Sequence, residues 1–71
     1  MQITSAQVQK ILNGSYTFAM LGFSLMVTRL QAVYKKEPTQ EKLHLCIAEI
    51  DAFLQKYSSI MPADLAVISK I

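Results

Sequence analysis

The sequence predicts an all-α fold, a small bundle of three to four helices that forms a single domain over residues 1–71. Apolar residues recur at spacings of three and four, and no segment sustains the alternation of apolar and polar residues that is typical of a strand. Turn-forming residues divide the chain at Asn13-Gly14, at Pro38 and at Ser58-Ser59. With 52% hydrophobic and 17% charged residues, the composition excludes intrinsic disorder.

The first helix is predicted over about residues 5–13. Thr4 and Gln7 have the T-x-x-Q spacing of a capping box, in which each side chain accepts a hydrogen bond from the other residue's backbone N–H. Ile3 and Val8 occupy the flanking positions of a hydrophobic staple. Asn13-Gly14 is typical of a helix end.

The second helix is predicted over about residues 15–36, with Ser15 as its N-cap and Pro38 just beyond its end. At about 100° per residue it carries two opposed apolar faces. The broad face consists of Tyr16, Ala19, Met20, Phe23, Met26, Val27, Leu30, Val33 and Tyr34, and the opposite face of Phe18, Leu21, Leu25 and Ala32. A helix with two apolar faces is covered on both sides or lies in a membrane.

The third and fourth helices are predicted over about residues 40–58 and 61–70. Thr39 is a suitable N-cap for the third helix, and Glu41 lies in its first turn, where an acidic residue is favoured. Pro62 suits the first turn of the fourth helix. The third helix has one clear apolar stripe, made of Leu43, Cys46, Ile47, Ile50, Phe53, Leu54 and Tyr57.

A homodimer is expected to complete this bundle. A domain of about 60 residues buries only about 60% of the surface that its unfolded chain exposes, so its stability margin is thin and a second apolar face on one helix favours a partner. We therefore expect Phe18, Leu21, Leu25 and Ala32 to form the interface with a second copy or with another protein. The predicted function is that of a non-enzymatic protein–protein interaction module that self-associates through the second helix.

The charge distribution bears on possible partners. The net charge of +2 is too small to indicate nucleic-acid binding, but residues 1–36 carry +4 and residues 37–71 carry −2. This asymmetry could orient antiparallel self-association. Alternatively, Lys35 and Lys36 simply complement the dipole at the end of their helix. A helix-turn-helix interpretation fails because the second helix presents Phe, Leu and Met where base-reading side chains are needed.

No catalytic, cofactor-binding or metal site is expected. Glu41-x-x-His44 has the spacing of one di-iron ligand pair, but the second helix lacks matching carboxylates before Glu37. Cys46 and His44 lie two residues apart, so they do not face each other on a helix. Glu49 and Asp51 fail as a carboxylate pair for the same reason. The chain has no nucleotide-binding, hydrolase or zinc motif, and no small-molecule substrate is predicted.

A membrane span over residues 11–28 is the lesser alternative. This segment is uncharged and 18 residues long, but its polar residues leave only the 12 residues 16–27 as a good apolar stretch. The single cysteine and the lack of a signal-peptide pattern favour a soluble protein of the cytoplasm, and small proteins with this type of N-terminal sequence are common in bacteria.

An inhibitor or immunity-type protein that stays monomeric until it binds a specific target is the other alternative. The size, the helical layout and QKYSSIMPADL (residues 55–65) resemble bacteriocin immunity proteins, in which a tyrosine-containing segment leads to a proline at the last helix. The resemblance covers few residues, and no family is assigned from it. It implies a monomer whose Phe18 and Leu25 are exposed to a target.

Overall fold

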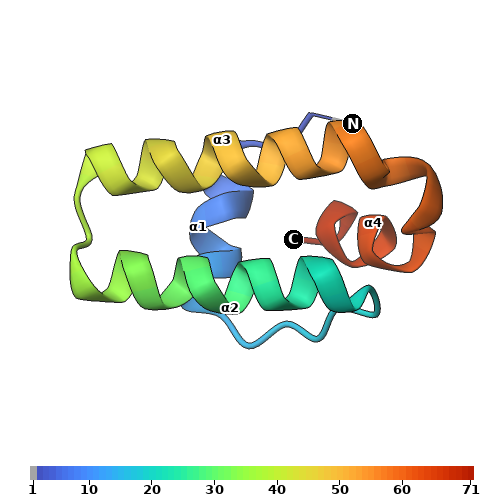
Figure 1. Cartoon of the computed structure of the whole chain (residues 1–71), viewed down its shortest axis with the longest axis horizontal. Coiled ribbons are helices and arrows are strands. Elements are labelled where there is room, and N and C mark those ends of the chain that lie inside the picture. The colour runs from blue at the N-terminus through green and yellow to red at the C-terminus, as the bar shows by residue number, and fades with distance from the viewer. Residues whose placement is uncertain (1) are drawn as a thin grey trace.

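A computed structural model describes residues 2–71, and Figure 1 shows their arrangement. Over these residues the chain forms α-helices and no β-strand, which confirms the all-α prediction. The elements are α1 (Ser5–Asn13), α2 (Leu21–Lys36), α3 (Gln40–Tyr57), the 3-10 helix η1 (Ser58–Ile60) and α4 (Pro62–Ser69).

The two long helices α2 and α3 form an antiparallel hairpin along the longest dimension of the molecule (Figure 1), whose extents are 31 × 20 × 20 Å. The short helix α1 packs across both. Helix α4 is tied to α1, because the Gln7 side chain donates to the Ile68 carbonyl and Lys10 donates to the Ile71 carbonyl, both at 3.3 Å. The two short helices therefore cover the core side of the hairpin.

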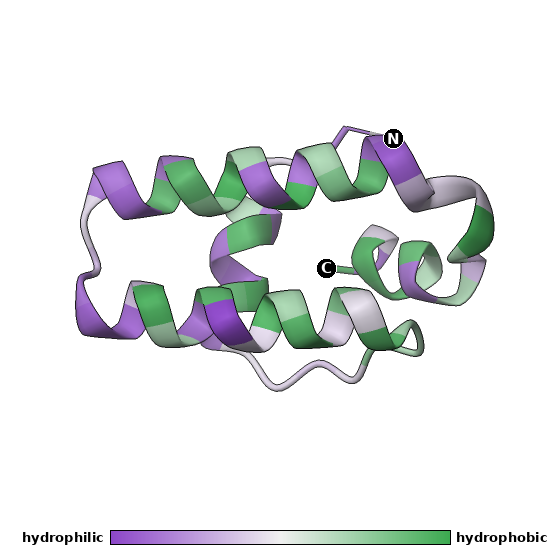
Figure 2. Cartoon of the chain, viewed as in Figure 1, coloured by the Kyte–Doolittle hydropathy of each residue, from purple (hydrophilic) through white to green (hydrophobic). Residues whose placement is uncertain are grey.

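The core lies between the hairpin and the two short helices. Figure 2 shows hydrophilic residues gathered where α2 ends and α3 begins, and apolar residues distributed along the helices around the interior. Each α-helix contributes to one buried cluster, which contains Ile3, Val8, Ile11, Leu12, Phe18, Phe23, Val27, Leu30, Leu43, Cys46, Ile50, Leu54, Met61 and Ile68.

Helix α1 begins as predicted. The Thr4 N–H donates to the Gln7 side chain at 3.0 Å and the Gln7 N–H donates to the Thr4 hydroxyl at 3.1 Å, which completes the capping box. It also ends at Asn13, as predicted. Gly14 has an extended backbone with φ −105°, so the helix does not end in a left-handed glycine.

Helix α2 begins six residues later than predicted, at Leu21 instead of Ser15. Residues 15–20 are non-helical, and Ser15 does not cap the helix. Instead the Asp64 carboxylate, from the first turn of α4, accepts hydrogen bonds from the backbone N–H groups of Ala19 at 2.6 Å and Met20 at 2.9 Å. A contact 45 residues away along the chain therefore fixes where the helix starts.

The later boundaries agree with the predictions to within one residue. Helix α2 ends at Lys36, two residues before Pro38. The Thr39 hydroxyl accepts from the Lys42 N–H at 3.2 Å and caps α3 as expected. The 3-10 turn follows, and Pro62 occupies the start of α4, where its missing N–H leaves no hydrogen bond unmade.

Candidate functional site

One side of α2 is left uncovered by the rest of the chain. Leu21 is 71% exposed and Leu25 is 61% exposed. Thr28 and Ala32 are exposed on the same side of the helix, and these four residues are called the α2 outer face below. Their spacing of four, three and four residues is that of the contact seam in paired helices. The seam lies opposite the buried side of α2, which carries Phe23, Val27 and Leu30.

Phe18 does not belong to this surface, although the sequence placed it there. It lies in the segment before α2 and is only 7% exposed. Its ring packs edge-to-face against Phe23, with the ring centroids 4.7 Å apart. The prediction assumed that residues 15–20 continue the helix, whereas the Asp64 hydrogen bonds hold Ala19 and Met20 outside it, so Phe18 is directed into the core. Leu21, Leu25 and Ala32 remain on the exposed side.

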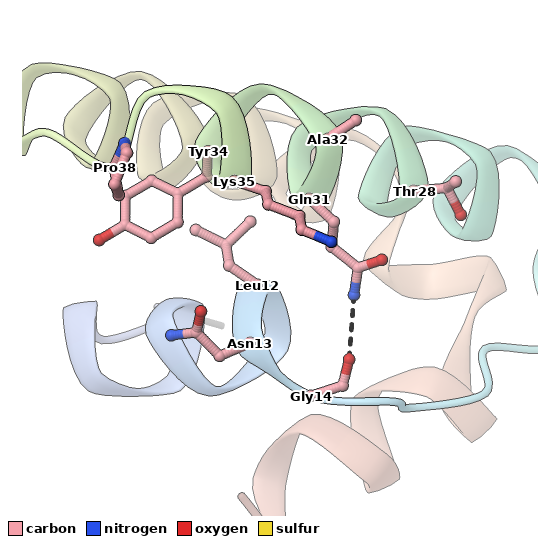
Figure 3. A pocket seen from close by; sticks show the side chains of 9 residues that line it. All are labelled: Leu12, Asn13, Gly14, Thr28, Gln31, Ala32, Tyr34, Lys35 and Pro38. Atoms are coloured by element: carbon pink, nitrogen blue, oxygen red, sulfur yellow. Dashed lines mark hydrogen bonds between the residues drawn. The ribbon is translucent and has the colours of Figure 1, made fainter.

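A groove of about 570 Å³ opens beside the α2 outer face, between α2 and the end of α1 (Figure 3). Its lining consists of Leu12, Asn13, Gly14, Thr28, Gln31, Ala32, Tyr34, Lys35 and Pro38. Among the lining residues, Gln31 joins α2 to the end of α1, because its amide donates to the carbonyls of Ile11 at 2.9 Å and Gly14 at 3.2 Å. Thr28 and Ala32 belong both to the groove and to the α2 outer face, so the two features are continuous.

An ion pair borders the other side of the α2 outer face. Arg29 donates to Glu49 of α3 at 2.8 Å, and both side chains are about half exposed to solvent. Through this hydrogen bond and its charge, Glu49 raises the pKa of the Arg29 guanidinium. Screening by solvent makes such a surface pair a weak contribution to stability. The ion pair lies at the boundary between the α2 outer face and the polar surface beside it.

The structure does not bring Cys46 and His44, the residues considered as a catalytic pair, together. Cys46 is fully buried, whereas His44 is exposed. Burial, and to a smaller extent the charge of Glu49, raises the pKa of the Cys46 thiol. A protonated buried thiol behaves as a small hydrophobic side chain rather than as a nucleophile. Over residues 2–71, no three His, Cys, Asp or Glu side chains are grouped so that they could hold a metal ion.

The structure also bears on the membrane alternative. Within the part of the chain that the structure describes, no helix combines the length and apolar character needed to span a bilayer. The predicted apolar stretch is interrupted by the non-helical residues 15–20, so α2 keeps only the 16 residues from Leu21 to Lys36.

Asp64 is the residue with a clear structural role that sequence reasoning missed. Asp64 lies in the first turn of α4, a position where an acidic residue is common and needs no distant partner. The structure buries it to 2% exposure against the segment that precedes α2. No local pattern signals this contact, because its partners are backbone N–H groups of a distant segment.

Comparison with protein-family models, curated proteins and solved structures found no match to this chain. Its function must therefore be argued from its own surfaces, of which the α2 outer face and the adjoining groove are the most distinctive.

Proposed function

We propose that this protein is a non-enzymatic helical interaction module that self-associates through the α2 outer face. The observation that carries the proposal is the exposure of Leu21 and Leu25 on the side of α2 opposite its buried residues. Single exposed leucines are common on protein surfaces. Two of them one helical turn apart, in a seam completed by the smaller Thr28 and Ala32, form a surface suited to another helix.

The expected strength of association follows from the number of leucines. A symmetric pair would cover Leu21 and Leu25 twice, and burying a leucine side chain contributes about 1.5–3 kcal/mol. Four partly covered leucines therefore contribute on the order of 6 kcal/mol. The loss of translational and rotational freedom on association costs about 4–15 kcal/mol. A gain of about 6 kcal/mol exceeds only the low end of this cost, so a dimer that relies on these leucines is weak and reversible, and its population rises with concentration.

The test is the absolute mass of the protein in solution, measured by light scattering after size exclusion over a tenfold range of concentration. The wild type is expected to approach twice the 8.0 kDa chain mass as concentration rises. Leu25→Arg should remain at the chain mass, because it places a charge in the middle of the seam. Ile60→Arg is the matched control, since Ile60 is 65% exposed but lies in η1. This variant should dimerise like the wild type.

Two results would contradict the proposal. A wild type whose mass stays at 8.0 kDa over the whole range of concentration does not self-associate. A dimer that Leu25→Arg leaves intact uses another surface. In the first case, increased binding of a hydrophobic dye by the monomer, lost in Leu25→Arg, would favour the monomeric target-binding alternative.

A further inference from the structure

We infer that two copies of this chain pair antiparallel along α2, with Leu21 against the partner's Ala32 and Leu25 against the partner's Thr28. This inference rests on the proposed self-association and adds its direction and register. It places a two-fold axis between Met26 and Val27. Such a contact uses the same surface on both copies and closes after two chains.

The sizes of the four side chains favour this register. The large residues, Leu21 and Leu25, occupy the first half of the seam, and the smaller Thr28 and Ala32 occupy the second half. Antiparallel pairing about the centre of the seam sets each large side chain against a small one. Parallel pairing in register would set Leu21 against its own copy and Ala32 against its own copy, which leaves a void at Ala32. Close packing disfavours such voids.

The groove lies beside the positions at which the partner's leucines would pack. Thr28 and Ala32 are among the residues that line the groove (Figure 3), so it opens beside the residues that the register assigns to the partner's leucines. The partner's Leu21 meets α2 at Ala32, on the edge of this hollow. One chain thus carries both an exposed apolar side chain and a recess, at positions that an antiparallel two-fold axis brings close together.

Charge favours the same direction. Helix α2 carries Arg29, Lys35 and Lys36 and no acidic residue. Parallel pairing would place the lysines of both copies side by side, and like charges brought together oppose association. Antiparallel pairing separates the two Lys35 residues by about 25 Å along the axis, at about 1.5 Å per residue.

Disulfide trapping tests the direction and the register together. In a Cys46→Ala background, Leu21→Cys and Ala32→Cys are prepared as separate proteins, and circular dichroism checks that each one folds. They are then oxidised alone and as an equal mixture. A disulfide requires Cα atoms about 4.4–6.8 Å apart. The mixture is expected to give predominantly the mixed disulfide, identified by its mass, whereas each protein alone should give little dimer. Ile60→Cys reports the background of random collision.

Each other outcome overturns a defined part of the inference. Efficient homodisulfides of Leu21→Cys or Ala32→Cys alone indicate parallel pairing. A wild-type dimer that gives no disulfide above the Ile60→Cys background does not use this register. A wild type that is monomeric by light scattering overturns the proposed self-association itself. If Cys46→Ala does not fold, the native background serves, because the Cys46 side chain is 0% exposed.

Discussion

At Gly14, the residue that follows α1, the backbone leaves no room for a side chain. A Cβ atom built there would lie 2.6 Å from the Tyr16 ring and 2.7 Å from the Lys10 carbonyl oxygen. The tyrosine could rotate away, but the carbonyl belongs to the helix backbone. The requirement for glycine is therefore steric, and it arises from a close approach rather than from a left-handed conformation.

Gly14→Ala is expected to destabilise the protein by about 1–3 kcal/mol, the usual effect of a group inserted where packing is already tight. The midpoint of urea unfolding, followed by circular dichroism, measures the change. Gly22→Ala is the matched control, because its Cβ would meet only the Phe53 ring at 3.7 Å, an ordinary contact. In the first turn of α2 alanine is favoured over glycine, by up to about 1 kcal/mol. The two substitutions should thus have opposite signs, and equal effects would contradict this account of Gly14.

At the scale of the element, the start of α2 depends on a carboxylate from another helix. Met20 is the N-cap residue, and its side chain caps nothing. Asp64 instead binds the two residues just before the helix, with one oxygen accepting from the Ala19 N–H and the other from the Met20 N–H. This contact also holds residues 15–20 out of the helix and thereby directs Phe18 into the core.

Asp64→Ala is expected to destabilise the fold by roughly 2–4 kcal/mol, because two backbone donors lose a charged acceptor. Asp64→Asn keeps one acceptor oxygen and should lose about half as much. Asp51→Ala is the control, since Asp51 accepts one exposed hydrogen bond from Gln55 within its own helix. Its effect should stay within about 0.5 kcal/mol. The midpoints of urea unfolding are compared for the wild type and the three variants, and similar midpoints for Asp64→Ala and Asp51→Ala would refute the role of Asp64 at the start of α2.

The boundaries that could be predicted from the sequence are those set by local chemistry. Thr4 with Gln7, Thr39 with Lys42, and Pro62 each act within one turn, so their spacing along the chain carries the information. The start of α2 could not be predicted in this way, because the sequence offers Ser15 as a local cap and the structure uses Asp64. The placement of Phe18 failed for the same reason.

The exposed residues of the candidate interface followed from helical periodicity. Leu21, Leu25 and Ala32 lie within the part of α2 that is helical, so their angular positions were correct. The groove beside them was not predicted. It depends on how α1 meets α2 through the bonds from Gln31 to Ile11 and Gly14, a contact between segments about 20 residues apart.

At the scale of the whole molecule, self-association couples stability to concentration. If the folded dimer dissociates as it unfolds, a tenfold rise in concentration stabilises it by about 1.4 kcal/mol. The melting temperature of the wild type should then rise by a few degrees, as followed by circular dichroism. Leu25→Arg should melt at one temperature throughout the range, and Ile60→Arg should behave like the wild type. A wild-type melting temperature that does not change with protein concentration would argue against a dimer linked to folding.

The link between Asp64 and the start of α2 also governs the order in which the chain can reach its final form. During synthesis, α1, α2 and α3 emerge before the residue that fixes residues 15–20 in place. A nascent chain that ends at α3 lacks both the acceptor for Ala19 and Met20 and the core residues Met61 and Ile68. Local helices form within microseconds, whereas contacts between distant segments must wait until both are available. The surface that α2 offers to a partner therefore acquires its final boundary only when the last helix has been made.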